Sequence, residues 1–523
     1  MTSQYQDHLT HLKHHANPHM LRGICHGIER EGLRVTPAAR LAQTSHPEAL
    51  GKALTHPYIT TDYSEALLEF ITPVHCRIDD TLAFLEELHV FTCLNLNGES
   101  IWAGSMPSYL EGDSKIPIAR YGDSNIGRMK SVYREGLAHR YGKAMQTIAG
   151  IHYNFSLPEE FWNCLSEKRS NEPLGSHRQS SGYLALIRNF RRYSWLLMYL
   201  FGASPAISKS FLPEEATLSL DEFDKDTLYS PYATSLRMSD LGYTNNAQSS
   251  LNICYNTLDN YVESLSGAIK TPYQPYEEIG LKRGDQYLQL NTNLLQIENE
   301  YYSTIRPKRV ARSGEKPITA LRQHGVEYIE VRCLDINPFE PLGISSVDAH
   351  FQDVFLVYCA LQSHDDIDAA ECQEVESNFN RVVTEGRRPG LCLQKRGGDI
   401  SLMQWAGQLL GDMQSVAVML DQANNTRSFS DSVEAQLAKL HDVTLTPSAQ
   451  VLAAMKERNL GYIDLVQSLS ETHSESFRQK GLNGERYSYF WQVAEQSRAD
   501  QKRKESEDET PFDRFLTEYF AAE

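Results

Sequence analysis

Short segments with alternating apolar and polar residues fill much of the chain before residue 345. This period-two pattern predicts β-strands with one buried face. Residues 27–35 (GIEREGLRV) and 150–157 (GIHYNFSL) are clear examples, rich in β-branched and aromatic residues. We expect strands in six segments: 27–35, 67–74, 150–157, 249–258, 288–302 and 325–334.

After about residue 345 the pattern changes to apolar residues spaced three and four apart, which predicts helices at 349–364, 401–423 and 433–441. The charged segment 498–520 is expected to be a solvated helix or partly disordered. Because strands do not alternate regularly with helices, the pattern favours an α+β fold over a doubly wound sheet. We expect residues 1–345 and a mainly helical part, 346–523, to form one continuous body.

Composition narrows the function classes. The formal net charge of −18 argues against nucleic-acid binding, which needs clustered Lys and Arg. The longest apolar run, 193–207, is too short to cross a bilayer and instead predicts a buried helix ended by Gly202 and Pro205. The nine cysteines include no C-x-x-C pair, so we expect neither a disulfide framework nor a zinc module, and a cytoplasmic protein.

Two glutamates stand out in the first predicted strand. Alternation places Glu29 and Glu31 on one face, with carboxylates roughly 6 to 7 Å apart, so that one metal or two neighbouring metals could bind between them. The alternative is an edge strand with a solvated acidic face.

The same arrangement recurs in other predicted strands. His152 and Asn154 share a face, as do Glu330 and Arg332, and Glu69 is a lone acid in an apolar strand. A buried acid of this kind should be paired, protonated or bound to a cation. Carboxylates with one histidine and no thiolate are the ligands of Mg²⁺ or Mn²⁺. The alternative is that these strands belong to different sheets and their side chains never meet.

Basic residues that suit carboxylate or phosphate groups occur in other segments. They are Arg134, Arg237, Arg306, Lys308, Arg309 and Arg312. Walker, Rossmann, H-E-x-x-H and G-x-S-x-G motifs are all absent, so ATP binding would need another scaffold.

Several of these segments closely resemble the γ-proteobacterial type of glutamate–cysteine ligase. The likeness is carried by residues 27–35, 46–74, 105–110, 121–156, 199–207, 232–245, 294–309 and 325–344. It implies a glutamine-synthetase-like fold, in which a curved antiparallel sheet forms a funnel for ATP and metals, flanked by helices. It also implies ATP-dependent joining of the glutamate γ-carboxylate to the cysteine amine, the first step of glutathione synthesis.

The resemblance also assigns roles to individual residues. The implied metal ligands, for Mg²⁺ or Mn²⁺, are Glu29, Glu31, Asp62, Glu69, His152 and Glu330. The implied substrate-binding residues are Tyr63, Tyr133, Arg134, Arg237 and Tyr243. Arg332 and Asn154 fall near the transferred phosphate or glutamate. Tyr63 occupies a cysteine-pocket position at which a well-known relative has phenylalanine.

The implied partners are the small molecules L-glutamate, L-cysteine and ATP, and we expect a monomer that binds neither nucleic acid nor membrane. Two other functions remain open. A guanidino kinase of the same fold would release ADP in response to a guanidino compound. A non-catalytic metal or amino-acid sensor would bind ligands without nucleotide turnover.

Overall fold

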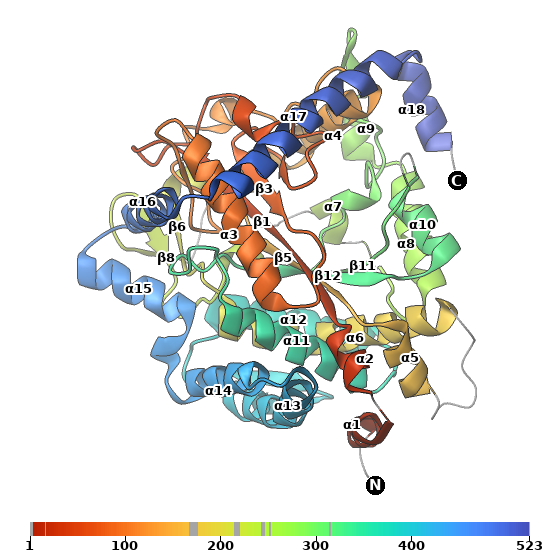
Figure 1. Cartoon of the computed structure of the whole chain (residues 1–523), viewed down its shortest axis with the longest axis vertical. Coiled ribbons are helices and arrows are strands. Elements are labelled where there is room, and N and C mark those ends of the chain that lie inside the picture. Colours follow the sequence, from red (N-terminus) through yellow and green to blue (C-terminus); the bar gives the residue numbers. More distant parts are fainter. Residues whose placement is uncertain are drawn as a thin grey trace.

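The computed structural model describes residues 4–15, 17–166, 176–213, 220–241, 246–249, 251, 253–312 and 315–521 (Figure 1). The strands are β1 Cys25–Val35, β2 Ile59–Thr61, β3 Leu67–Ile71, β4 Ser100–Ile101, β5 Ile151–Ser156, β6 Ala206–Ser208, β7 Asp221–Glu222, β8 Thr227–Tyr229, β9 Lys282–Arg283, β10 Gln286–Tyr287, β11 Ile305–Lys308, β12 Tyr328–Leu334, β13 Cys392–Lys395 and β14 Gly398–Ser401.

Helices surround the strands. They are α1 Gln4–His15, α2 Pro18–Arg22, α3 Ile78–Asn95, α4 Asn125–Tyr141, α5 Glu159–Ser166, α6 Ser176–Phe201, α7 Asn246–Ser249, α8 Leu258–Lys270, α9 Gln274–Ile279, α10 Pro317–His324, α11 Ser346–Leu361, α12 Ala369–Glu385, α13 Leu402–Asn424, α14 Ser428–His441, α15 Pro447–Arg458, α16 Tyr462–Lys480, α17 Gly484–Glu507 and α18 Phe512–Ala521. Among the described residues, no helix has the length and apolar character that a membrane crossing requires.

One antiparallel sheet dominates the fold. Its strand order is β11-β12-β5-β1-β3-β2, and β4 pairs with the far end of β1. Four of the six predicted strands, 27–35, 67–74, 150–157 and 325–334, form β1, β3, β5 and β12 within this sheet. The α+β class with a central antiparallel sheet is therefore confirmed.

The two faces of the sheet differ sharply. One face is apolar and buried, with Ile28, Phe70, Tyr153, Phe155 and Val331 each at most 1% exposed. Helices α3, α6 and α11 contact the sheet strands or one another on this side. Because side chains alternate along each strand, the polar residues between these apolar ones all project from the opposite face. We call that opposite face the polar face.

Two predicted strands are wrong. In 288–302, backbone N–H groups bond to polar side chains instead of a neighbouring strand: the Leu290 amide donates to Gln296 Oε1 at 2.9 Å and the Asn293 amide to Asn291 Oδ1 at 3.0 Å. Polar side chains close to the backbone compete with strand pairing in this way. The described residues of 249–258 also form no strand.

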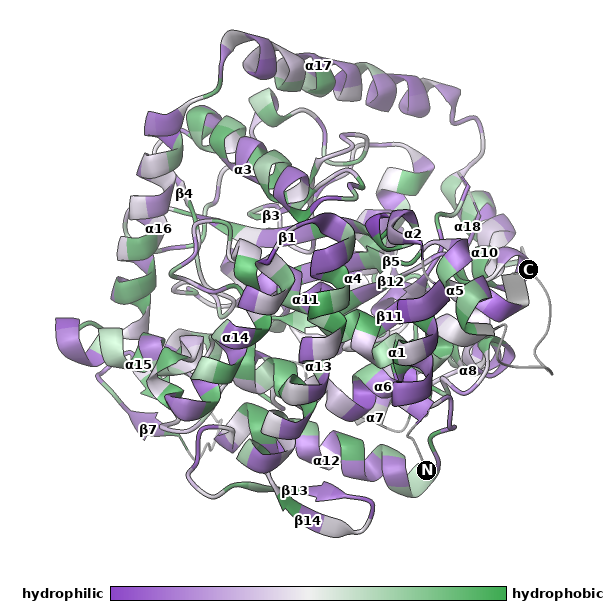
Figure 2. Cartoon of the chain, turned by 60° about the horizontal axis from the view of Figure 1, so that its bottom comes forward, coloured by the Kyte–Doolittle hydropathy of each residue, from purple (hydrophilic) through white to green (hydrophobic). Residues whose placement is uncertain are grey.

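The predicted helices after residue 345 are confirmed as α11, α13 and α14. They pack together beneath the sheet in Figure 1, whereas α16 packs along α3 and β4. The buried helix predicted at 193–207 is also confirmed in part, since α6 ends at Phe201, directly before Gly202. Helix α17 is mainly hydrophilic in Figure 2, yet it buries Phe490 and Ala494.

One disulfide joins Cys25 to Cys76, although we expected no disulfide framework. Cys25 begins β1, and Cys76 follows β3, its antiparallel neighbour. A backbone bridge between His26 and His75 extends the pairing of these segments, which brings the two Cα atoms to 4.1 Å. The partners are 51 residues apart in sequence, so local spacing could not reveal them.

Residues 501–516, which we call the C-terminal clasp, hold the start of α4. The carboxylate of Asp508 accepts the backbone N–H of Asn125, and Glu505 accepts that of Asp123 at 3.1 Å. Carboxylates at a helix N-terminus satisfy orphan N–H groups and complement the helix dipole. An apolar cluster continues the contact between α4 and α18 and includes Met129, Leu290, Phe512 and Leu516.

Ser124 is the N-cap residue of α4 and bonds the Gly127 N–H, so Asp508→Ala removes one further hydrogen bond to a charged group. We therefore expect this variant to destabilise the first turn of α4 by about 1 kcal/mol. Amide hydrogen exchange at residues 125–128 should become several-fold faster, while exchange in the central strands stays unchanged. The exposed neighbour Glu509, changed to Ala, is the control and should leave exchange in α4 at the wild-type rate. Equal exchange in both variants would show that Asp508 does not cap α4.

Candidate active site

Strand pairing gathers the predicted acids on the polar face. Glu29 on β1 lies opposite His152 on β5, and Glu31 lies opposite Glu69 on β3. On the other side of β5, Asn154 lies opposite Glu330 on β12. The alternative of separate sheets is therefore wrong. The solvated-edge alternative is also wrong, because β1 lies between two strands and Glu31 is only 6% exposed.

His152 is the centre of this cluster. Its Nδ1 lies 3.0 Å from Glu29 Oε2 and 3.7 Å from Glu330 Oε1, and its Nε2 lies 3.6 Å from Glu31 Oε1. Glu29, His152 and Glu330 each offer a ligand atom within 4.8 Å of the other two. Three donors this close could share one cation.

The acids respond differently to burial. Burial and the Glu330 charge oppose ionisation of Glu29, but the hydrogen bond and charge of His152 bring its pKa below the ordinary value. Burial also opposes ionisation of Glu330, but Lys308, Arg332 and His152 hold its pKa well below that value. These two groups are therefore ready-made anionic ligands at neutral pH.

The pKa values of Glu31 and Glu69 are shifted in the opposite direction. Burial raises the pKa of Glu31 even though His152 acts to lower it. Burial, followed by the charges of Glu29 and Asp62, raises the pKa of Glu69 well above its ordinary value. Burial therefore makes ionisation of Glu31 and Glu69 less favourable than in water, and a nearby cation would offset this cost.

The residues fit a hard divalent cation. Their donors are carboxylate oxygens and one imidazole, with no thiolate among them, as Mg²⁺ or Mn²⁺ prefers. Two buried oxygens, Glu330 Oε2 and Asn154 Oδ1, accept no hydrogen bond from the described residues. Buried polar atoms normally have a partner, so these oxygens are available to a cation or its bound water.

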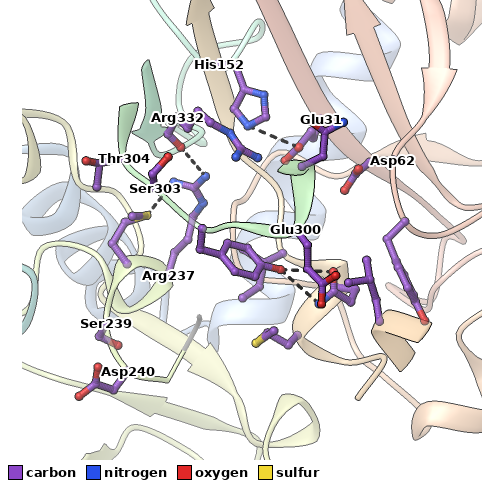
Figure 3. A pocket seen from close by; sticks show the side chains of 18 of the residues that line it. Glu31, Asp62, His152, Arg237, Ser239, Asp240, Glu300, Ser303, Thr304 and Arg332 are labelled. Atoms are coloured by element: carbon purple, nitrogen blue, oxygen red, sulfur yellow. Dashed lines mark hydrogen bonds and ion pairs between the residues drawn. The ribbon is translucent and has the colours of Figure 1, made fainter. Parts of the chain in front are cut away.

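A cavity of about 400 Å³ opens beside this cluster (Figure 3). It brings together eight of the predicted residues: Glu31, Asp62, Tyr63, Tyr133, Arg134, His152, Arg237 and Arg332. Glu29, Glu69, Asn154 and Glu330 are not part of its lining and belong to the strands behind it. Tyr243 lies outside the described residues.

Arg237 is fixed by the end of β12. Its Nη2 donates to the Arg332 carbonyl at 3.0 Å, and its Nη1 lies 3.5 Å from the buried carboxylate of Asp335. The guanidinium also lies over Gly150, where an added Cβ would meet Nη2 at 2.1 Å. The Gly150 N–H donates to Glu31 Oε2 at 2.7 Å, so one glycine touches both the acid cluster and this arginine.

Helix α4 supplies the opposite wall. Tyr133 and Arg134 lie on the face that Lys130 and Leu137 share, and Arg134 Nε donates to the carbonyl of Asp62. The Arg134 guanidinium stacks 4.5 Å from the ring of Tyr121. Stacking and hydrogen bonding together fix its orientation in the cavity wall.

Lys130, which lies near Glu69 and Asp62, was not predicted from the sequence. Burial and the neighbouring Arg134 lower the pKa of its ammonium to about 8, although Glu69 and Asp62 act to raise it. The signal was its position three and four residues before Tyr133 and Arg134 on one helix. Nor did the sequence predict the buried Glu300, which lines the cavity and accepts hydrogen bonds from Arg140 and Tyr141.

Comparisons with known proteins give matches over most of the chain. A family model described as glutamate–cysteine ligase matches residues 9–382. A glutamate–cysteine ligase of Azotobacter vinelandii is 54% identical over 526 residues, which cover 100% of this chain and 99% of that protein.

Two solved structures are similar. The crystal structure of glutamate–cysteine ligase from Francisella tularensis in complex with AMP has a TM-score of 0.89 and 38% identity, covering 95% of this chain and 98% of that one. A bifunctional glutathione synthetase from Pasteurella multocida has a TM-score of 0.70 and 24% identity, covering 91% of this chain and 55% of that one, and shows the fold alone.

We expect Glu31→Gln to keep the fold while removing one anionic oxygen from the cluster. The variant should need more Mg²⁺ and turn over roughly 10- to 1000-fold more slowly, as is typical when one charge contact at a reaction centre is lost. A Mg²⁺ titration of ADP release measures both effects. The exposed Glu48, changed to Gln, should reproduce the wild-type curve; a wild-type curve for Glu31→Gln would exclude a metal role for this strand.

The raised pKa of Glu69 predicts a pH-dependent response to metal. In the metal-free protein, burial and the neighbouring acids shift Glu69 toward its neutral form, so the stability that this group contributes is lost as pH rises through its raised pKa. A bound cation favours the ionised form and must displace the proton. Mg²⁺ should therefore raise Tm more at pH 8 than at pH 6.

Glu69→Gln is the matched test, because it removes the titrating group and retains its shape. The difference between the two Mg²⁺-induced Tm shifts should shrink in this variant and persist in Glu48→Gln. An undiminished difference in Glu69→Gln would mean that another group titrates.

Proposed function

Because the chain belongs to the glutamate–cysteine ligase family, whose reaction is the ATP-dependent first step of glutathione synthesis, we propose how its residues perform that reaction. The observation that carries the proposal is that the acid cluster and the cavity adjoin each other. The acid cluster around His152 opens directly into a cavity whose wall presents Arg134, Arg237 and Arg332. Such a site can hold phosphate groups on one side and amino-acid carboxylates on the other.

The chemistry requires activation before bond formation. A γ-carboxylate oxygen of L-glutamate attacks the terminal phosphorus of ATP, the bond from phosphorus to the bridging oxygen breaks, and ADP leaves. The amine of L-cysteine, after losing a proton to solvent, then attacks the carbonyl carbon of the γ-glutamyl phosphate. The new C–N bond replaces the C–O bond, and inorganic phosphate leaves.

No side chain of the protein needs to act as a nucleophile in either step. The protein's task is to align the partners and neutralise charge, which dominates catalysis of phosphoryl transfer. Arg237, held rigid by Asp335 and the β12 carbonyls, would bind an amino-acid carboxylate through its fork. Tyr133, Arg134 and Tyr243 are proposed to complete the amino-acid sites.

Arg332 and Asn154 are proposed to contact the transferred phosphate. Arg332 lies on β12 two residues after Glu330 and lines the cavity, which suits it to a position between acids and substrates. Asn154 donates from Nδ2 to Glu29 at 3.0 Å, which leaves its buried Oδ1 for a ligand. Positioned donors of this kind act on charge that develops in the transition state.

The proposed metal is Mg²⁺, with Mn²⁺ as an alternative, and ATP is the proposed co-substrate. The proposed ligands are Glu29, Glu31, Asp62, Glu69, His152 and Glu330. When bound, the cation supplies the positive charge that lets an acidic cluster accept a triphosphate.

We propose that Tyr63 contributes to the cysteine pocket. It lines the cavity and is 1% exposed, and its hydroxyl has no hydrogen-bond partner among the described residues. A buried hydroxyl of this kind gains from a ligand that can bond to it. Tyr63 would therefore favour an acceptor with a polar side chain.

We also propose that residues 1–345 are the catalytic part and that the helical residues 346–523 support it. All the residues predicted for the site precede residue 345, and Glu376 and Asn380 of α12 complete the lining of the cavity. The supporting contacts are those of α16 on α3 and of the C-terminal clasp on α4.

Family membership favours the ligase over the guanidino-kinase and sensor alternatives. We expect sustained ADP release only when glutamate, cysteine, ATP and a divalent cation are all present. Omitting cysteine should reduce release to about one ADP per enzyme at most, because the activated glutamate has no acceptor. Full turnover without cysteine, or turnover that requires a guanidino compound, would contradict the proposal.

A further inference from the structure

A second cavity, of about 140 Å³, lies under the C-terminal helix, where Figure 1 shows α18 near α8 and α10. We call it the α18 cavity. Its wall comes from four segments that are far apart in sequence: α8, residues 296–298, the start of α10, and the end of α18. A cavity of roughly 150 Å³ accepts a six-membered ring. It is therefore large enough for a small organic molecule.

Positive charge gathers at this cavity in a chain whose net charge is −18. Lys270, Lys316 and Arg322 line it, against a single acid, Glu298. That acid is already engaged, because Glu298 Oε1 accepts the backbone N–H of Ile318 in the first turn of α10 at 3.2 Å. Among the described residues, the wall of this cavity thus has more cationic than anionic side chains.

Two of the cations face the rim. Lys270 and Arg322 are exposed, and neither forms an ion pair with any residue in the described part of the chain. Arg322 reaches only the Ser266 hydroxyl, at 3.5 Å. An anionic group would therefore gain two cationic partners without displacing an existing acid.

The inner wall is apolar and aromatic. It is formed by Ile269, Ile297, Ile318, Tyr519 and Phe520. The Lys316 ammonium lies 5.3 Å from the centre of the Tyr519 ring, so the aromatic surface adjoins the cationic one. A ligand with an apolar ring and one anionic group matches both surfaces.

We propose that the α18 cavity is a second binding site, for a small organic anion that carries an apolar ring. One wall separates it from the cavity of about 400 Å³ beside the acid cluster, which we call the substrate cavity. Gln296, Ile297 and Glu298 line the α18 cavity, and the next residues of the same segment, including Asn299 and Glu300, line the substrate cavity.

The two cavities are also joined by direct contacts. The fully buried Gln296 donates from Nε2 to the carbonyl of Tyr133 at 3.2 Å, and its own N–H donates to Glu300. A ligand that shifts Gln296 would therefore move both a helix and a loop of the substrate cavity. This effect of the ligand on the substrate cavity rests on the function proposed above, whereas binding in the α18 cavity does not.

Phenyl phosphate is a suitable probe, because it joins one ring to one anionic group. Calorimetric titration would be done on the full chain with saturating ADP, Mg²⁺ and glutamate, which keep the probe out of the substrate cavity. We expect one saturable site, with phenol and inorganic phosphate each binding at least fivefold more weakly. Absence of saturable binding, equal binding of inorganic phosphate, or displacement of the probe by ATP would overturn the proposal.

The double variant Lys270→Met, Arg322→Met should weaken phenyl phosphate binding at least tenfold. Both side chains are exposed, so the fold should persist. Lys225→Met, at a lysine with 89% side-chain exposure on another surface, should bind as the wild type does. Unchanged affinity in the double variant would overturn the assignment.

A separate measurement tests whether a ligand in the α18 cavity affects the substrate cavity. Saturating phenyl phosphate should change the KM for glutamate or cysteine at least twofold in the wild type and not in the double variant. Binding without any change in KM would overturn the communication while leaving the binding site in place. Failure of the ligase assay in the absence of probe would instead count against the proposed function alone.

Discussion

Mutual repulsion among carboxylates buried on one sheet face is the constraint on which the structure depends. Glu29 and Glu31 on β1, Glu69 on β3 and Glu330 on β12 lie on three strands of one sheet, and burial disfavours the charge of each. The protein compensates unevenly. His152, Lys308 and Arg332 stabilise the charges near β12, whereas Glu69 near the opposite edge keeps a raised pKa. The sheet therefore holds an incomplete ion cluster, which a cation and a phosphate chain can complete.

Alternation along strands made the centre of this site predictable. A period of two fixes which residues share a face, so Glu29 with Glu31 and His152 with Asn154 followed from spacing alone. Strand order does not follow from spacing, and neither does the pairing that sets Glu29 against His152. Asp62 lies after β2, and its place in the site came only from family resemblance, as did that of Tyr63. The segment 288–302 misled because its polar side chains bond its own backbone.

Rigid anchoring of the cavity arginines is a second theme. Arg237 is held by β12 carbonyls and Asp335, and Arg134 by the Asp62 carbonyl and the ring of Tyr121. A guanidinium that is fixed before substrate arrives loses little conformational entropy on binding. Gly150 adds a geometric link, since its missing side chain makes room for Arg237 while its N–H bonds to Glu31. The acid cluster and the cavity wall that carries Arg237 are therefore one mechanical unit.

The cap on α4 has a consequence for protein synthesis. Tyr133 and Arg134 are translated early, but the carboxylate that caps their helix belongs to Asp508, near the other end of the chain. A ribosome-bound chain that has made the whole sheet still lacks this cap and the α18 side chains packed against α4. The wall that carries Tyr133 and Arg134 is thus held partly by contacts between segments 383 residues apart, so folding of the first part of the chain does not by itself supply them.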